Sequence, residues 1–174
     1  SGETVIEEND NVYIFAERED LSRLFIDLGR KSEKNESVII VGGTMIGTLV
    51  CEELVSGGIK VAFIDKDRAI CESLSEKFED ALVIHSDISE EGVFEEEQLE
   101  DYDLIITATN NEELNILSSV YAKSLGIKRA MALVTKSGYI PIAKKLNIDS
   151  IVSPKLSTVN AILKFVRRGD IKSV

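Results

Sequence analysis

Short apolar runs alternate with amphipathic segments from about residue 37 to the end of the chain. The runs are nearly continuous in hydrophobic residues, which is typical of strands buried on both faces of a parallel sheet. They predict six strands, at residues 38–41, 61–64, 81–84, 104–107, 130–134 and 150–152. Because helical segments separate these strands, we predict an α/β fold, a doubly wound, parallel, six-stranded Rossmann sheet of strand order 3-2-1-4-5-6.

Apolar residues at helical spacing predict the helices that connect these strands. Residues three and four positions apart lie on one face of a helix, so each set is expected to face the core. Glycines mark two of the helix ends. The sets are Ile46, Val50 and Leu54 before Gly57-Gly58; Ile70, Leu74 and Phe78; Leu114, Leu117, Val120, Tyr121 and Leu125 before Gly126; and Leu156, Val159, Ile162, Leu163 and Val166.

The first part of the chain does not share this pattern. Two apolar runs, at 4–6 and 12–16, predict strands, and a short helical pattern follows them. This segment is too short to enclose a core of its own. We interpret residues 1–28 as a short β-rich remnant, the C-terminal part of a preceding small regulatory domain. Residues 29–37 are polar and predict a linker, and residues 38–174 then form the Rossmann domain.

Charge and composition exclude several classes of partner. Twenty basic and 31 acidic residues give a net charge of −11, which disfavours nucleic acid and anionic lipid headgroups. No apolar run approaches the roughly 18 residues of a membrane-spanning helix. Cys51 and Cys71 have no metal-type spacing and are expected to be small buried hydrophobes, as in a reducing cytoplasm.

A glycine-containing run follows the first predicted strand and opens a helix. Its spacing is that of a dinucleotide-binding fingerprint, in which Gly42 permits a tight turn and Gly47 lets helix and strand pack closely. Amides at the start of the helix can then bind a pyrophosphate. Thr44 stands where the fingerprint has its middle glycine, and a plain strand-to-helix turn is the alternative interpretation. The residues assigned to the cofactor are Gly42, Gly43, Thr44, Met45, Ile46 and Gly47.

The second and third predicted strands end in further candidate ligands. Asp65, with Lys66 beside it, lies about 20 residues after the glycines, where an acidic side chain accepts both ribose hydroxyls of an adenosine and disfavours a 2′-phosphate. Asp67 is expected to cap the following helix. The third strand leads into the run Ser86-Asp87-Ile88, which is placed over the adenine. The alternative for Asp65 is a solvated turn acid or a helix cap, and the alternative for Asp87 is a cap of the next segment.

The fourth strand runs into Thr107-Ala108-Thr109, at the point where the strand order reverses and ligands bind. We assign these three residues to the cofactor site, with an ordinary strand-turn-helix as the competing interpretation. Asn110 or Asn111 is expected to cap the next helix. His85 is the only histidine and is interpreted as structural. The acidic run at 90–101 lacks calcium-loop spacing and is interpreted as a solvated helix face.

The order of these residues along the chain resembles that of a known protein family. The stretch from Val38 to Val174 is similar to the nucleotide-binding domains of TrkA, the regulatory subunit of Trk-type potassium uptake, within the wider group of domains that regulate potassium conductance. The matching segments are Val41-Gly42-Gly43, Ile64-Asp65, His85-Ser86-Asp87, 107–115, 122–126, Tyr139, Leu146, Asp149, Val152-Ser153-Pro154-Lys155 and 165–169.

The resemblance implies a cytoplasmic regulatory subunit that binds NAD(H), or in some members ATP or ADP. It implies two tandem lobes, with residues 1–28 as the end of the first. It also implies a homodimer or a higher ring that reaches the inner face of the membrane through a potassium transporter. Its ligand positions are Gly42, Gly43, Gly47, Asp65, Asp87 and 107–109.

We therefore expect a protein that senses NAD(H) without turning it over and is not an enzyme. One alternative is an NAD-dependent oxidoreductase, which would need a proton donor and a substrate-binding lobe. The other is a Rossmann-shaped assembly module that has lost its ligand, and Thr44 is the residue that favours it.

Overall fold

The structure is a computed structural model that describes residues 35–90 and 92–154, together with Leu24 and Asp27. The chain divides into two units, residues 1–34 and 35–174. The expectations for residues 1–28, and for a helix carrying Leu156 to Val166, lie outside the described residues.

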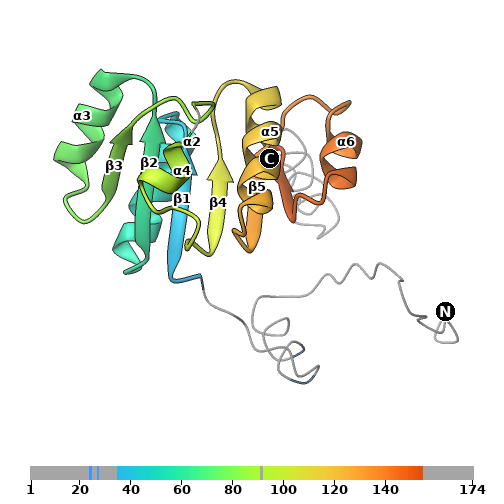
Figure 1. Ribbon diagram of the computed structural model, residues 1–174, viewed down its shortest axis with the longest axis horizontal. Coiled ribbons are helices and arrows are strands. Elements are labelled where there is room, and N and C mark those ends of the chain that lie inside the picture. The colour runs from blue at the N-terminus through green and yellow to red at the C-terminus, as the bar shows by residue number, and fades with distance from the viewer. Residues whose placement is uncertain (1–23, 25–26, 28–34, 91, 155–174) are drawn as a thin grey trace, which may run out of the picture. The chain divides into compact units, whose positions relative to one another are not determined.

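Six parallel strands form one sheet, as predicted, in the order β3-β2-β1-β4-β5-β6. In Figure 1 the arrowheads of β3, β2 and β4 point in the same direction. The order reverses between β1 and β4, so the loops after these two strands diverge and leave a crevice. The strands are β1 (Ser37–Val41), β2 (Lys60–Asp65), β3 (Leu82–His85), β4 (Leu104–Thr107), β5 (Arg129–Leu133) and β6 (Ser150–Val152).

Helices cover both faces of the sheet (Figure 1). Side chains of α2 and α3 pack on one face, and those of α4 and α5 pack on the other. Three helices begin at residues whose side chains accept backbone N–H groups of the first turn: Thr44, Asp67 and Asn111. The helices are α2 (Met45–Ser56), α3 (Arg68–Lys77), α4 (Val93–Glu96), α5 (Glu112–Ser124) and α6 (Ile140–Lys145).

The central strands are buried on both faces, which explains their continuous hydrophobic sequences. Val38 and Ile40 of β1 pack toward Cys51 of α2, whereas Ile39 and Val41 belong to the core on the α4 and α5 side. Alternate strand residues point to opposite faces, so a strand covered twice cannot alternate apolar with polar positions. Cys51 and Cys71 are buried and unpaired, and burial raises the pKa of the Cys51 thiol to about 11.

The predicted core face of α5 was wrong in part. Leu117 and Tyr121, expected to face inward, are 64% and 42% exposed. The helix instead buries mostly small or polar side chains: Glu112, Asn115, Ile116, Ser118, Ser119 and Ala122. Small residues let the helix lie close to β4 and β5, where the Ser119 hydroxyl and the Asn115 side-chain amide find partners.

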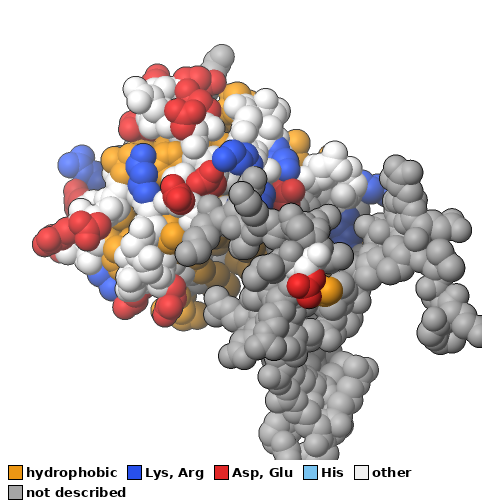
Figure 2. Space-filling view, turned by 90° about the horizontal axis from the view of Figure 1, so that it is seen from below, with side chains coloured by type: hydrophobic (Ala, Val, Ile, Leu, Met, Phe, Trp, Pro, Cys, Tyr) orange, Lys and Arg blue, Asp and Glu red, His pale blue; other side chains and the backbone are white. Residues whose placement is uncertain are grey.

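The surface mixes both charges with apolar side chains on the face that Figure 2 shows. Described acids of the 90–101 run, including Glu95, Glu96, Glu97 and Glu100, are exposed, in agreement with a solvated face. Within the described ranges, no helix has the length and apolar character needed to span a bilayer.

Candidate nucleotide site

A cleft of about 430 Å³ lies at the carboxyl ends of β1, β2, β3 and β4. This is the edge at which open α/β sheets bind ligands, and the volume is in the range of small-molecule sites. The turn between β1 and α2 lies between the other contributing loops. The lining residues are Val41, Gly42, Gly43, Thr44, Ile64, Asp65, Lys66, Asp67, Ile70, Ser86, Asp87, Ile88, Thr109, Asn110, Asn111 and Leu114.

The glycine turn has no space for side chains. Gly42 has φ +108°, and a Cβ there would lie 2.7 Å from the backbone nitrogen of Thr109. A Cβ on Gly43 would overlap the Ile70 side chain, and one on Gly47 would overlap the carbonyl oxygen of Gly42. The turn therefore approaches the cleft as bare backbone, and Gly47 provides the close helix–strand packing that the fingerprint spacing predicts.

Thr44, the departure from the fingerprint, caps α2. Its hydroxyl oxygen accepts the N–H of Gly47 at 3.2 Å, and its hydroxyl proton is donated to the carbonyl oxygen of Ala108 at 2.8 Å. The side chain thus joins the glycine turn to the end of β4 across the crevice. The side chains of Met45 and Ile46 do not line the cleft, so these two residues remain in the site hypothesis only through their backbone N–H groups.

Asp65 ends β2 beside this turn. One carboxylate oxygen accepts the N–H of Gly43 at 2.5 Å, and the other accepts that of Asp67 at 2.8 Å. Asp67 in turn caps α3 through the N–H groups of Ala69 and Ile70, as the sequence predicts. Each Asp65 oxygen keeps a second lone pair, so the carboxylate holds the turn in place and can still accept ribose hydroxyls.

The loop after β3 forms the far end of the cleft. Asp87 accepts the backbone N–H and the hydroxyl of Ser89, at 3.0 and 2.7 Å, and these bonds lower the pKa of Asp87. The Ser86 hydroxyl donates to Glu90 at 3.3 Å. Asp87 is thus both a turn-forming residue and a cleft residue, and Ile88 lines the cleft from a buried position. His85 lies outside the cleft lining, with its ring 3.0 Å from the carbonyl oxygen of Lys66.

Three residues at and after the end of β4 were assigned to the cofactor site, and they lie in different positions relative to the cleft. Thr109 lines the cleft, but Thr107 and Ala108 do not. Thr107 is fully buried, and its hydroxyl donates to the Asn115 carbonyl oxygen at 2.9 Å and lies 3.0 Å from the Ser119 hydroxyl. Its position on the strand points it under α5, away from a ligand. The prediction of a ligand contact for the Thr107 side chain is therefore corrected.

Sequence reasoning missed several lining residues. Asn110 and Asn111 belong to the same turn as Thr109, so the rule that placed Thr109 in the site also applies to them. Ile70 and Leu114 lie in the first turns of their helices, and no local pattern marks such apolar positions as ligand contacts. The cleft residues absent from the sequence-based assignment are Val41, Ile64, Asp67, Ile70, Asn110, Asn111 and Leu114.

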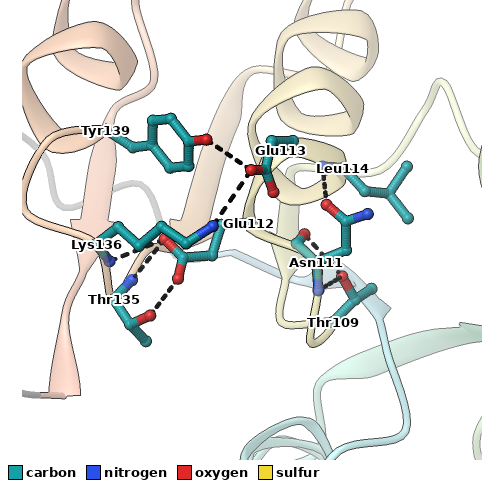
Figure 3. Close-up of polar contacts among 8 residues, drawn as sticks. All are labelled: Thr109, Asn111, Glu112, Glu113, Leu114, Thr135, Lys136 and Tyr139. Carbon is teal, nitrogen blue, oxygen red and sulfur yellow. Dashed lines mark hydrogen bonds and ion pairs between the residues drawn. The ribbon is translucent and has the colours of Figure 1, made fainter.

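A polar cluster next to the cleft joins the first turn of α5 to the loop after β5 (Figure 3). The Glu112 carboxylate accepts the backbone N–H groups of Thr135 and Lys136, at 3.1 and 2.9 Å, and the Thr135 hydroxyl. Glu113 accepts the Tyr139 hydroxyl at 2.6 Å and pairs with Lys136 at 3.3 Å. Burial raises the pKa of Glu112, but these hydrogen bonds outweigh it and lower the pKa overall.

The residues present fit an adenine dinucleotide. The bare backbone of the glycine turn leaves space for phosphates, which the start of a helix stabilises. An acid stands at the end of β2, and apolar Ile70 and Ile88 flank the adenosine end of the cleft. Such a nucleotide supplies anionic phosphates and ribose hydroxyls, and the backbone N–H groups at the start of α2 and the Asp65 carboxylate are the groups placed to meet them.

Comparison with known proteins assigns the family. The TrkA-N domain family matches residues 38–154, which include the whole sheet apart from Ser37. The chain belongs to this family. The Trk system potassium uptake protein TrkA of Halomonas elongata is 35% identical over 173 residues, which are 99% of this chain and 38% of that protein. The chain thus spans well under half the length of the TrkA proteins it matches.

Solved structures show the same fold for this TrkA-N domain. The TrkA-N domain of the Escherichia coli inner membrane protein YbaL has a TM-score of 0.68 at 15% identity, covering 76% of this chain and 98% of that one. The GsuK channel bound to NAD gives 0.66 at 19% identity, over 88% of this chain and 27% of that one. GsuK bound to ADP gives 0.64 at 18% identity, over 80% and 36%.

Proposed function

We propose that this TrkA-N domain is a nucleotide-sensing part of a cytoplasmic regulatory subunit, and that it binds NAD(H) without turnover. The observation that carries the proposal is the cleft, in which the glycine turn and the Asp65 carboxylate meet within 2.5 Å. The chain is 35% identical to a TrkA protein over 99% of its length, which supports potassium uptake as the regulated process. The partner is then a membrane potassium transporter.

The cleft supports binding better than chemistry. Its ionisable lining residues are Asp65, Lys66, Asp67 and Asp87, all at the end of β2 or on the loops after β2 and β3. A dinucleotide whose adenosine lies against these loops extends its second half toward Asn110 and Leu114. Neither of these side chains is a proton donor or base of the kind that hydride-transfer enzymes use. A regulatory ligand needs only differential binding to two states of the protein.

Asp65 favours an adenosine ribose without a 2′-phosphate, as in NAD(H), and an adenine nucleotide is the second ligand to test. GsuK has been solved with NAD and with ADP, and both contain the adenosine diphosphate group that the turn and Asp65 fit. Affinity in the micromolar range or weaker is expected, because the net charge of −11 gives no general attraction for phosphates.

Calorimetry with NADH, NAD, ADP and ATP tests the proposal directly. We expect NADH to bind and its absorbance to stay constant with a panel of hydroxy and keto acids. Steady, substrate-dependent consumption of NADH would indicate an oxidoreductase. No binding by any of the four nucleotides would indicate a ligand-free assembly module. In the full-length protein, Asp65→Ala is expected to abolish nucleotide-dependent change in potassium uptake by cells.

A further inference from the structure

Asn115 is a fully buried polar residue in the first turns of α5, and it does not line the cleft. Its side-chain oxygen accepts the Thr109 N–H at 2.9 Å and the Thr109 hydroxyl at 2.6 Å. Its side-chain nitrogen donates to the carbonyl oxygens of Thr109 and Leu133, both at 3.0 Å. A primary amide has two donors and two acceptor lone pairs, and all four are used.

Three of these four bonds converge on one cleft residue. The amide holds the N–H, the carbonyl and the hydroxyl of Thr109, so it fixes the conformation of that residue as well as its place. Thr109 in turn lies against the glycine turn, because a Cβ on Gly42 would lie 2.7 Å from its nitrogen. Asn115 therefore holds the residue that packs against the glycine turn where the two loops face each other.

The fourth bond links the same amide to the carboxyl end of β5. Leu133 is the last residue of that strand, and the next loop residues, Thr135 and Lys136, are held by Glu112 of the same helix. The first turn of α5 thus contacts the cleft on one side and the β5 loop on the other (Figure 3). A displacement of Thr109 cannot occur without changing the hydrogen bonds of Asn115.

We propose that Asn115 is a positioning residue of the nucleotide site: it holds Thr109 against the glycine turn and couples the cleft to the carboxyl end of β5. The inference rests on the proposed function for its ligand. A helix packed on a sheet does not by itself require an amide at this position. An apolar residue of similar size would avoid the cost of a buried polar group that loses a partner.

The variant Asn115→Ser tests the proposal, with Ser119→Ala as the matched control. Ser119 is also fully buried, lies one turn further along α5, and contacts the Thr107 hydroxyl. In the ligand-free chain, we expect amide exchange of Thr109 to be at least tenfold faster in Asn115→Ser and unchanged in Ser119→Ala. NADH affinity, measured where both variants are fully folded, should fall at least tenfold in Asn115→Ser and less than threefold in Ser119→Ala.

Equal NADH affinity in a folded Asn115→Ser variant would overturn the proposal, as would equal losses in the two variants. If Asn115→Ser does not fold, the coupling is tested by titrating NADH into the isotope-labelled wild-type chain and following its amide chemical shifts. Amide shifts should then change at Thr109 and at residues 134–136, and a change confined to the cleft side would refute the coupling. Failure of the wild type to bind NADH or ADP would refute the proposed function, whereas the ligand-free exchange of Thr109 reports on Asn115 alone.

Discussion

The Asp65 carboxylate accepts the N–H groups of Gly43 and Asp67, and it also lines the cleft. Charged acceptors make the stronger hydrogen bonds, so two ribose hydroxyls should contribute about 1.5–3 kcal/mol. We expect Asp65→Ala to weaken NADH binding roughly ten- to a hundred-fold by calorimetry. The control is Asp67→Ala, which removes the neighbouring helix cap and leaves the ribose acceptor in place.

The same carboxylate should make the wild type prefer NADH to NADPH. The 2′-phosphate of NADPH would lie beside Asp65, and two negative groups at that distance repel each other. Competition of NADPH against bound NADH measures the preference. Equal affinity for the two nucleotides would show that Asp65 serves only to hold the glycine turn.

Thr44 is the residue at which this sequence departs from the fingerprint, and we expect Thr44→Gly to tighten NADH binding. The Thr44 hydroxyl already donates its proton to the Ala108 carbonyl oxygen, and the hydroxyl oxygen accepts the Gly47 N–H. Glycine in its place frees that N–H for a phosphate oxygen and removes side-chain bulk. The loss of the cap costs only a few tenths of a kcal/mol when glycine replaces threonine. Side-by-side calorimetric titration of the two proteins measures the change.

Thr44→Val separates bulk from hydrogen bonding, because valine keeps the shape and lacks the hydroxyl. If bulk limits the affinity, Thr44→Val should bind no more tightly than the wild type. Weaker binding by Thr44→Gly at unchanged stability would mean that the threonine hydroxyl turns toward the nucleotide and binds it.

At the scale of single elements, the start of α5 carries several buried polar contacts. Glu112 is 9% exposed and accepts two backbone N–H groups of the loop after β5. Removing the carboxylate leaves both N–H groups without an acceptor, so Glu112→Ala should lower the free energy of unfolding by about 1–3 kcal/mol in urea denaturation. The exposed neighbour Glu113 is the control, and Glu113→Ala is expected to stay within about 0.5 kcal/mol.

The contribution of Glu112 should also depend on pH. Its pKa is lowered in the folded protein, against a value of about 4.3 in the unfolded chain. The unfolded state then binds the proton more readily, so the stabilisation is complete above roughly pH 4.3 and is lost as the pH falls through the folded pKa. The difference in stability between wild type and Glu112→Ala should shrink on acidification below that value. A constant difference down to the acid transition would contradict this account.

At the scale of the whole molecule, exposed apolar side chains on α5 and α6 predict self-association. Large hydrophobic side chains at the surface include those of Leu117 and Tyr121 on α5, Ile142 on α6 and Leu146 directly after α6. We expect a homodimer through the Rossmann helices in sedimentation at concentrations well above micromolar, and a monomer for Leu117→Lys. Leu82→Lys, at an exposed leucine of β3, is the control. A wild-type protein that stays monomeric at these concentrations would refute the expectation.

The sequence by itself determined the fold of the described unit and most of the cleft. Strands covered on both faces must be continuously apolar, so all six were found within a residue or two of their ends. Right-handed crossovers then leave few possible strand orders. The glycine spacing and the strand-end acid are local in sequence, which is why the positions of Gly42, Gly47 and Asp65 could be anticipated.

Only the tertiary structure decided which face of α5 is buried and which residues hold the cleft in shape. Helical periodicity shows that a helix has faces, but which one meets the sheet depends on what the strands beneath it present. For α5 these are the Thr107 hydroxyl and the Leu133 carbonyl oxygen, so Asn115 and Ser119 are buried while Leu117 is exposed. A buried amide is stable only where partner atoms satisfy it, and those of Asn115 include one 18 residues away along the chain.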